Sequence, residues 1–331
     1  LFIECLLNPR SLKNITLLAT SKFIEMKPED LLENGISFIM NTDGEQLIDW
    51  KNITKNDIVI IPAFGTSLEV LEILKTKEIC TEEFNTTCPF VSKVWNRLEQ
   101  IAKRGYTIVI YGTANHEETR STFSRAKKHG SAIIVENIND AQLLCDFIKG
   151  EVNKKKIQKH FYLKYSNNFN ISKDLNKLGV VNQTTMLASD TQEIINLFTN
   201  TFQTIHKTND TSQYVANTRD TLCYATHENQ ESTLNLLKHN TDLAIVVGGY
   251  NSSNTTHLVE LSSQTTKTFF INSSDKIKLN NSICHFDIKT KKEITTYDFI
   301  PDNKCKIILT SGASCPDIIL ENILLKLAEL K

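Results

Sequence analysis

Four short apolar runs, each followed by a turn of small residues and a helical pattern, constrain the fold of this chain most strongly. They span residues 58–61, 106–111, 243–247 and 306–309. Continuous apolar runs of this length are typical of buried parallel strands, and their alternation with helices is typical of an α/β protein. Weaker patterns predict further strands at residues 37–40, 132–135, 179–182 and 267–271. We therefore expect an α/β fold with parallel sheets.

Glycines mark the carboxyl ends of the four strong runs. The chain has only eleven glycines, and five of them follow these runs directly: Gly65, Gly112, Gly248, Gly249 and Gly312. Glycine lets the backbone turn sharply and approach a ligand closely, and open α/β sheets bind ligands at this edge. One such glycine would be explained by its own turn. Four turns of the same kind favour a ligand-binding edge.

The length and the recurrence of similar strand–helix units predict three domains. A chain of 331 residues is long enough for two or three domains. We place them at residues 1–87, 88–216 and 217–331. The Lys- and Asn-rich segment 150–177 interrupts the pattern and is expected to be an inserted surface arm. Residues 290–296 are expected to form a polar hairpin tip.

Charge, hydropathy and cysteine usage exclude several classes of protein. The net charge of -1 gives no basic surface for nucleic acid or anionic lipid. There is no signal peptide and no apolar run of about 18 residues, which a membrane helix would need. The eight cysteines include no CxxC pair and fit free thiols or metal ligands better than a disulfide framework. These features predict a cytosolic protein.

Two cysteines occur in matching surroundings. Cys88 lies in Asn-Thr-Thr-Cys-Pro-Phe and Cys223 in Asp-Thr-Leu-Cys-Tyr-Ala, and each has a threonine two residues earlier. Threonine or asparagine is expected to cap the helix 89–104, and its proline suits the first turn. A helix N-terminus favours a thiolate that binds metal or reacts. A single cysteine is more often a small buried apolar residue. Because the surroundings are repeated, two interpretations are equally supported here: small buried apolar residues, and two thiolates delivered to one centre.

Other polar segments also follow the predicted strands. His116 and the acidic pair Glu117-Glu118 begin a helix, where the helix dipole alone explains acidic residues. A histidine and a carboxylate at a strand end also suit an anion contact and a proton donor. Residues 251–254 and 310–314 bring hydroxyls and free amides to predicted helix starts, which suits either helix capping or a phosphate cradle. From the residues alone, the chain is an α/β protein that binds a phosphorylated small molecule, with or without a thiolate-bound metal.

The order of these motifs resembles the LytB family of 4-hydroxy-3-methylbut-2-enyl diphosphate reductases from about residue 58 to residue 324. The motifs that carry the resemblance span residues 85–91, 112–120, 182–186, 220–226, 248–261 and 310–317. Six motifs in the order of the family are specific. The insertion, and phenylalanine in Pro62-Ala-Phe-Gly65, resemble the longer form found in some bacteria and in plastids.

The resemblance implies a trefoil of three α/β domains around a central [4Fe–4S] cluster, with one cysteine from each domain and one open iron. Cys88 and Cys223 match two of the cluster ligands. Glu118 matches the proton donor, and Thr184 matches the residue that hydrogen-bonds to this donor. The residues that match the diphosphate contacts are His116, Ser252, Ser253, Asn254 and Ser314.

The implied activity is an iron–sulfur oxidoreductase of isoprenoid biosynthesis in the non-mevalonate pathway. It would reduce the hydroxylated diphosphate to isopentenyl and dimethylallyl diphosphate, with a ferredoxin- or flavodoxin-type electron donor. We expect a monomer that binds neither nucleic acid nor membrane. The implied location is the bacterial cytoplasm or the plastid stroma.

The N-terminal part departs from the family pattern. The family opens with a Gly-Phe-Cys-x-Gly-Val turn that carries the first cluster cysteine, and this sequence has no match to it. We interpret Cys5 as a core residue, and Phe23 and Ile24 stand near the place of a His-Asn pair that contacts diphosphate in the family. One interpretation is a reductase whose N-terminal segment is not included in this sequence. The alternative is an inactive or repurposed homologue that binds a prenyl-type diphosphate without redox activity.

Overall fold

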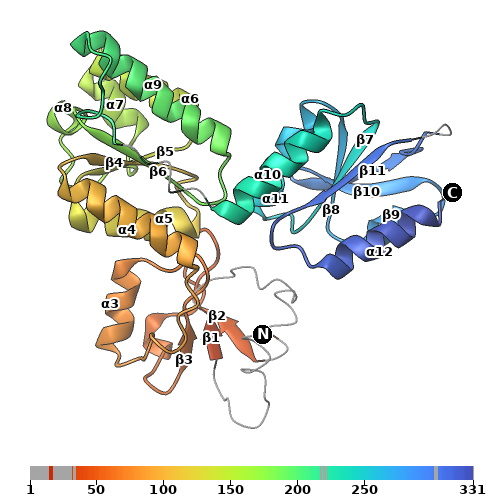
Figure 1. Cartoon of the computed structure of the whole chain (residues 1–331). Helices are drawn as coiled ribbons and strands as arrows, with labels where there is room; N and C mark the ends of the chain where they lie inside the picture. Colours follow the sequence, from red (N-terminus) through yellow and green to blue (C-terminus); the bar gives the residue numbers. More distant parts are fainter. Residues whose placement is uncertain are drawn as a thin grey trace. The chain divides into compact units, whose positions relative to one another are not determined.

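The computed structural model describes residues 15–17, 32, 35–216, 218, 221, 223–301 and 305–330. Cys5, Phe23 and Ile24 lie outside these residues. Contacts divide the chain into two compact units, residues 1–184 with 188–222 and residues 185–187 with 223–331. Figure 1 shows the elements of both units. None of the described helices combines the length and apolar character needed to cross a membrane.

The first unit contains two parallel sheets. The smaller sheet has the order β2-β1-β3 and consists of β1 (Ile15–Leu17), β2 (Ile36–Phe38) and β3 (Ile58–Ile60). The short helix η1 (Trp50–Asn52) and the helix α3 (Leu68–Thr76) belong to this part. Ile39, Val59 and Leu74 are fully buried in its apolar core.

The larger sheet of the first unit has the order β5-β4-β6. Its strands are β4 (Thr107–Tyr111), β5 (Ala132–Val135) and β6 (Leu178–Asn182), and all pairings are parallel. Every residue of the three strands is buried, because helices cover both faces. On one face lie α4 (Pro89–Lys103) and α5 (Glu117–His129), and on the other α6 (Ile138–Ile148) and α9 (Ala188–His206) (Figure 1).

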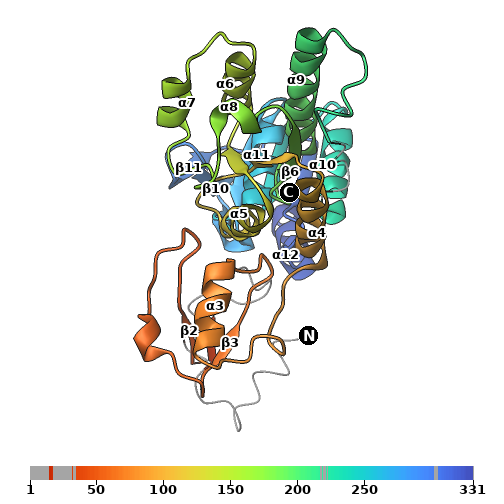
Figure 2. The ribbon, with the colours of Figure 1, turned by 90° about the vertical axis from the view of Figure 1, so that its left-hand side faces the viewer.

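The segment 150–177 is not a surface arm, and this prediction is wrong. It contains α7 (Lys154–His160) and α8 (Ile171–Asp174), and Figure 2 shows α7 beside α6. Tyr165 bridges antiparallel to Ile133 of β5, and Ser166 N donates to Ala132 O (2.9 Å). Apolar side chains of the segment, Ile157 and Phe161 among them, are fully buried. The exposed lysines dominate its composition and conceal these widely spaced apolar anchors.

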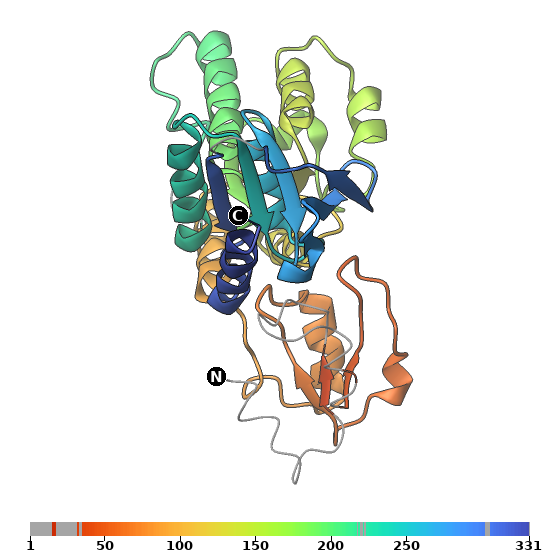
Figure 3. The ribbon, with the colours of Figure 1, turned by 90° about the vertical axis from the view of Figure 1, so that its right-hand side faces the viewer.

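The second unit contains a parallel sheet and an antiparallel sheet. The parallel sheet has the order β12-β7-β8, with β7 (Leu243–Val247), β8 (Lys267–Ile271) and β12 (Ile307–Ser311) side by side in Figure 3. The helices α10 (Tyr224–Leu237) and α11 (Ser253–Ser263) contact it, while Ile323 of α12 (Asp317–Ala328) packs into the core on its other face.

The antiparallel sheet has the order β11-β10-β9. It consists of β9 (Ile277–Lys278), β10 (Ser282–Asp287) and β11 (Lys292–Tyr297), preceded by the short helix η3 (Ser274–Lys276). A hairpin is present as predicted, but its tip lies between Asp287 and Lys292, and most of the segment 290–296 that was expected to form the tip belongs to β11. All eight predicted strands are present, with ends within two residues of the predictions. The α/β fold class is therefore confirmed. The division into three domains stays a prediction.

Four of the five glycines at the strand ends are required by packing inside each unit. A Cβ atom on Gly312 would lie 2.3 Å from Thr255 Oγ1, and one on Gly248 would lie 2.5 Å from the same atom. At Gly112 it would meet Thr119 Oγ1 at 2.7 Å, and at Gly65 it would meet the Trp95 ring at 2.3 Å. These glycines let helices approach the strand ends closely. Close packing explains them without a ligand, so they are not evidence for a binding edge.

Candidate functional site

Cys88 is held at the carboxyl end of β3 by main-chain hydrogen bonds. The residues before it run beside that strand, with Asn85 bridged to Ile61 and Thr86 N donating to Ile61 O (3.0 Å). The Thr86 hydroxyl donates to the same carbonyl (2.7 Å), and Cys88 N donates to Ala63 O (2.8 Å). Cys88 itself is the N-cap of α4, so the predicted threonine or asparagine cap is wrong. Its partly exposed thiol makes no capping hydrogen bond.

Cys223 has the same place directly before a helix in the second unit. It is the N-cap of α10, is partly exposed, and makes no side-chain capping hydrogen bond. Its carbonyl accepts from His227 N (2.9 Å), which closes the first helical turn. Both cysteines thus have extended backbone, a free thiol and a helix that begins at the next residue. The predicted symmetry of their local surroundings is confirmed.

The donor set of these cysteines fits a soft metal centre such as an iron–sulfur cluster. Cluster iron is held by cysteine thiolates, and neither thiol is engaged in capping the helix that it precedes. Within the described ranges, no group of three or more histidine, cysteine, aspartate or glutamate side chains is placed to hold a metal ion. Assignment of Cys88 and Cys223 as cluster ligands stays a prediction.

Glu118 and Thr184 lie together in the first unit, as the sequence motifs predicted. Glu118 Oε1 accepts from Thr184 N (2.6 Å), and Glu118 Oε2 accepts from Thr184 Oγ1 (2.8 Å). The Glu118 residue is 1% exposed. Burial raises its pKa to about 7, and the nearby Glu117 carboxylate acts in the same direction, while the two hydrogen bonds from Thr184 oppose the rise. A carboxyl group with this pKa is suited to donate a proton near neutral pH.

His116 is the N-cap of α5. Its Nδ1 accepts from Glu118 N (3.2 Å), so the imidazole satisfies one of the free amides of the helix start. The Phe64 ring meets the imidazole edge-on, with ring centroids 5.1 Å apart. Phe64 was noticed in the sequence only as a mark of the longer family form, and its contact with His116 was not predicted. The sequence feature that could have indicated this contact is an aromatic residue directly before a glycine at the end of a strand.

The connection from β4 to α5 is fixed by residues at the ends of the two strands that flank β4. Gly112 N donates to Val135 O (3.0 Å), and Thr113 N donates to Gln183 Oε1 (3.1 Å). Ala114 N donates to Glu136 Oε1 (2.8 Å). The sequence motif containing Gln183 therefore supports this loop, while its neighbour Thr184 holds Glu118. Glu136 was missed, because a single glutamate after a weakly predicted strand carries no distinctive pattern.

In the second unit, the segment 251–254 begins α11. Ser252 is its N-cap, and Ser252 Oγ accepts from Thr255 N (3.2 Å), so this serine has the capping role that was the alternative explanation. Ser253 Oγ accepts from Thr185 Oγ1 (3.0 Å). Asn254 is 6% exposed, and its Oδ1 has no hydrogen-bond partner among the described residues. Capping does not explain a buried amide of this kind, and a ligand could satisfy it.

Ser314 lies in the turn between β12 and α12. The helix begins at Asp317 with Pro316 as its N-cap, so the prediction that the 310–314 segment starts the helix is wrong. Cys315 N donates to Gly312 O (2.9 Å), and this turn leaves Ser314 partly exposed. Ser252, Ser253, Asn254 and Ser314 all belong to the second unit, whereas His116, Glu118 and Thr184 belong to the first. Their roles in binding and catalysis stay predictions.

Comparison with known proteins shows the family of this chain. Residues 24–328 match the sequence profile of the family described as LytB protein. A protein of Crocosphaera subtropica named 4-hydroxy-3-methylbut-2-enyl diphosphate reductase is 38% identical over 302 residues, which cover 91% of this chain and 73% of that protein. One of Gloeothece citriformis with the same name is 39% identical and covers 86% of this chain and 69% of its own.

Solved structures of similarly named enzymes share the fold. The structure of the E-1-hydroxy-2-methyl-but-2-enyl-4-diphosphate reductase from Plasmodium falciparum aligns with a TM-score of 0.67 at 25% identity, over 98% of this chain and 80% of that one. A structure of (E)-4-hydroxy-3-methyl-but-2-enyl diphosphate reductase, described as the terminal enzyme of the non-mevalonate pathway, aligns with a TM-score of 0.51 at 22% identity. This alignment covers 97% of this chain and 90% of that one.

Proposed function

Because the chain belongs to the LytB protein family, we propose that it reductively removes the hydroxyl group of 4-hydroxy-3-methylbut-2-enyl diphosphate. The products are isopentenyl and dimethylallyl diphosphate. The reaction consumes two electrons and two protons, breaks the carbon–oxygen bond and releases the hydroxyl oxygen as water. The relatives and solved structures named above are reductases by name, and they give no support to the alternative of a homologue without redox activity.

The observation that carries this proposal is the buried pair of Glu118 and Thr184. Loss of a hydroxide ion is unfavourable, so the leaving oxygen needs a proton. The Glu118 carboxyl, with a pKa of about 7, holds such a proton near neutral pH. Thr184 fixes both carboxyl oxygens and sets their direction. Glu118 therefore acts as the proton donor, and Thr184 positions it.

The remaining residues bind the substrate and the cofactor. Cys88 and Cys223 would hold a [4Fe–4S] cluster, which supplies electrons and an open iron that polarises the hydroxyl when bound. The residues that would bind the diphosphate are His116, Ser252, Ser253, Asn254 and Ser314. The fit is chemical, because hydroxyl, amide and imidazole groups near helix starts suit an anion. A ferredoxin- or flavodoxin-type protein would donate the electrons.

Anaerobic reconstitution of the full chain tests the proposal. The reconstituted protein should absorb near about 400 nm, as thiolate-bound clusters do, and should convert the hydroxylated diphosphate when given a chemical reductant. Cys88→Ser and Cys223→Ser should each lose iron, sulfide and this absorption. Cys80→Ser is the matched control, because Cys80 is also a free cysteine and is exposed. Full iron content in both ligand variants would contradict the ligand assignment, and a loaded protein without turnover would contradict the proposed activity.

A further inference from the structure

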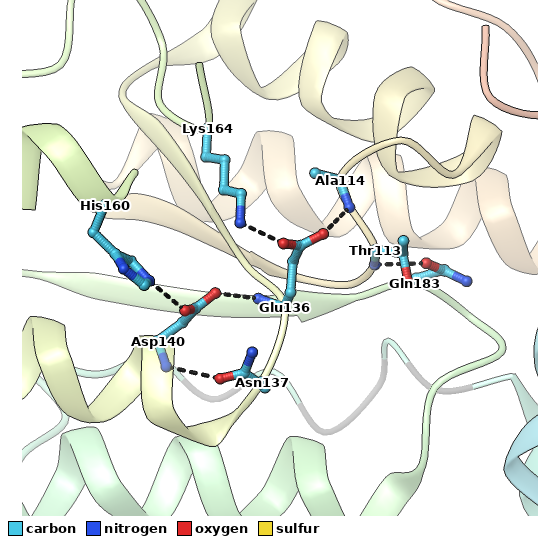
Figure 4. Close-up of polar contacts among 8 residues, drawn as sticks. All are labelled: Thr113, Ala114, Glu136, Asn137, Asp140, His160, Lys164 and Gln183. Carbon is cyan, nitrogen blue, oxygen red and sulfur yellow. Dashed lines mark hydrogen bonds and ion pairs between the residues drawn. The ribbon is translucent and has the colours of Figure 1, made fainter. Parts of the chain in front are cut away.

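A charged network in the first unit links the inserted segment to the loop that carries His116 (Figure 4). Glu136 follows β5 directly, and its two carboxylate oxygens have different partners. Glu136 Oε1 accepts from Ala114 N (2.8 Å), and Glu136 Oε2 forms an ion pair with Lys164 Nζ. Both side chains are more than two-thirds covered, at 31% exposed for Glu136 and 24% for Lys164. One carboxylate thus joins the insertion to the β4–α5 connection.

The positions of both charged residues are fixed by the main chain around them. Lys164 O accepts from Ile134 N (2.8 Å). Lys164 is therefore fixed beside Ile134 of β5, which lies two residues before Glu136 in the chain. Glu136 N donates to Asp140 Oδ2 (2.9 Å). Asp140 Oδ1 lies 2.6 Å from His160 Nε2 at the end of α7, so the insertion contacts this buried carboxylate a second time (Figure 4). These contacts therefore fix the Glu136 carboxylate in the position where it accepts from Ala114 N.

The loop that receives this carboxylate leads directly into the predicted catalytic residues. Thr113 O accepts from His116 N (3.0 Å), and the His116 ring then caps α5 in front of Glu118. Gln183 holds Thr113 from the β6 side, and Glu136 holds Ala114 from the β5 side. Without Glu136, Ala114 N would lose its acceptor, whereas the bonds from Gly112 N to Val135 O, from Thr113 N to Gln183 Oε1 and from Arg120 Nε to Asn115 O would remain. His116 would be affected most, because Glu118 keeps its separate bonds to Thr184.

We propose that Glu136 and Lys164 are positioning residues for the reaction, which hold Ala114 and thereby set the place of the substrate contact His116. The inserted segment is then a functional part of this chain, because it supplies Lys164 to the site. The link to substrate rests on the proposed function, whereas the hold on Ala114 does not.

Kinetics with matched variants test the effect on substrate. Glu136→Ala should displace His116 and so weaken its contact with the diphosphate. The KM for the hydroxylated diphosphate should then rise about tenfold, the effect expected for losing one hydrogen bond to a charged group. The change in kcat should be smaller, because the proton donor stays in place. Glu136→Gln should raise KM less than Glu136→Ala and to about the same extent as Lys164→Met, since its amide oxygen can still accept from Ala114 N while its ion pair with Lys164 is lost. Lys164→Met should raise KM alone but add nothing in the Glu136→Ala background, because it acts through Glu136.

Hydrogen exchange of the Ala114 amide tests the hold on the loop without any substrate or cluster. Exchange should accelerate about tenfold or more in Glu136→Ala and less in Glu136→Gln, which keeps an acceptor for Ala114 N. Lys127→Met is the control, because it removes a more exposed ion pair, with Glu69, from the other end of α5 and should change neither readout. Unchanged exchange or unchanged KM in Glu136→Ala, or equal effects in Lys127→Met, would overturn the proposal. If the unmodified chain has no turnover, the proposed function fails, and the exchange result alone decides whether Glu136 holds the loop.

Discussion

Glu118, a residue that is 1% exposed, accepts hydrogen bonds from both the amide and the hydroxyl of Thr184, at 2.6 and 2.8 Å. These residues are 66 positions apart in the chain. Burial and hydrogen bonding act on the carboxyl in opposite directions, and burial has the larger effect, so the pKa rises to about 7. Thr184 therefore tunes the acidity of Glu118 as well as its direction.

The activity should depend on this proton. Glu118→Gln should lower kcat by about 100-fold or more, as expected for loss of a general acid, while the dissociation constant of the substrate changes little. In the unmodified chain, kcat should fall as the pH rises through about 7, because the donor loses its proton. Steady-state rates and substrate binding across this pH range provide the measurement.

Thr184→Ala should move that profile to higher pH. The Thr184 hydroxyl stabilises the charged carboxylate, so its removal raises the pKa of Glu118 further. The amide bond from residue 184 is kept, so the carboxyl remains in place. Thr204→Ala on the exposed side of α9 is a suitable control, since its hydroxyl bonds only within that helix (2.8 Å). An unchanged or lower midpoint in Thr184→Ala would contradict the assignment.

The stability of the protein should also depend on the pH through Glu118. Because the pKa of Glu118 is higher in the folded than in the unfolded state, the folded state binds this proton more tightly. Its contribution to the free energy of unfolding is therefore fully present below about pH 4.5 and is lost as the pH rises through about 7. The expected loss is about 3 kcal/mol. Glu118→Gln should remove it, so urea unfolding of the variant should differ less between about pH 5 and pH 8.

Asn254 and Ser314 should contribute to substrate affinity. Alanine at either position should weaken binding by about 1–3 kcal/mol, as for a lost hydrogen bond to a charged group. Ser67→Ala is the informative comparison, because it removes the N-cap of α3, which is not among the proposed binding residues, and should lower stability by about 0.5–2 kcal/mol without changing affinity. Calorimetric binding and thermal unfolding separate the two effects. Loss of stability without loss of affinity in Asn254→Ala would favour a structural role.

The contact between Gly312 and Thr255 predicts a coupled pair of substitutions. Gly312→Ala should destabilise the second unit by about 1–3 kcal/mol, because its Cβ would lie 2.3 Å from Thr255 Oγ1. Adding Thr255→Ala should restore most of this loss, since the next nearest atom, Thr255 Cβ, would lie at an ordinary 3.5 Å. A double-mutant cycle by denaturant unfolding measures the coupling. Additive effects of the two changes would show that the contact is not the cause.

Much of the fold could be predicted from local sequence. The apolar runs that became β4 and β7 are continuous and bounded by small residues, and helices cover these strands on both faces. Their burial therefore leaves a direct trace in the residue types. The surroundings of Cys88 and Cys223 were also predictable, because an extended residue before a helix depends mainly on near neighbours. Even there, the capping residue was misplaced, since the helix begins directly after each cysteine.

The sequence alone determined the α/β class, the parallel strands, the candidate thiols and the motifs that show the family. The family motifs also predicted that Thr184 hydrogen-bonds to Glu118, but only the tertiary structure decided that the carboxyl group is buried there, that Glu136 and Lys164 hold Ala114, and that Thr255 fills the space beside Gly312. It also decided that the lysine-rich insertion packs against β5. The physical reason is that strand and helix patterns depend on neighbours a few residues apart. Contacts between distant side chains depend on where the packed sheets bring them, and no local pattern records that.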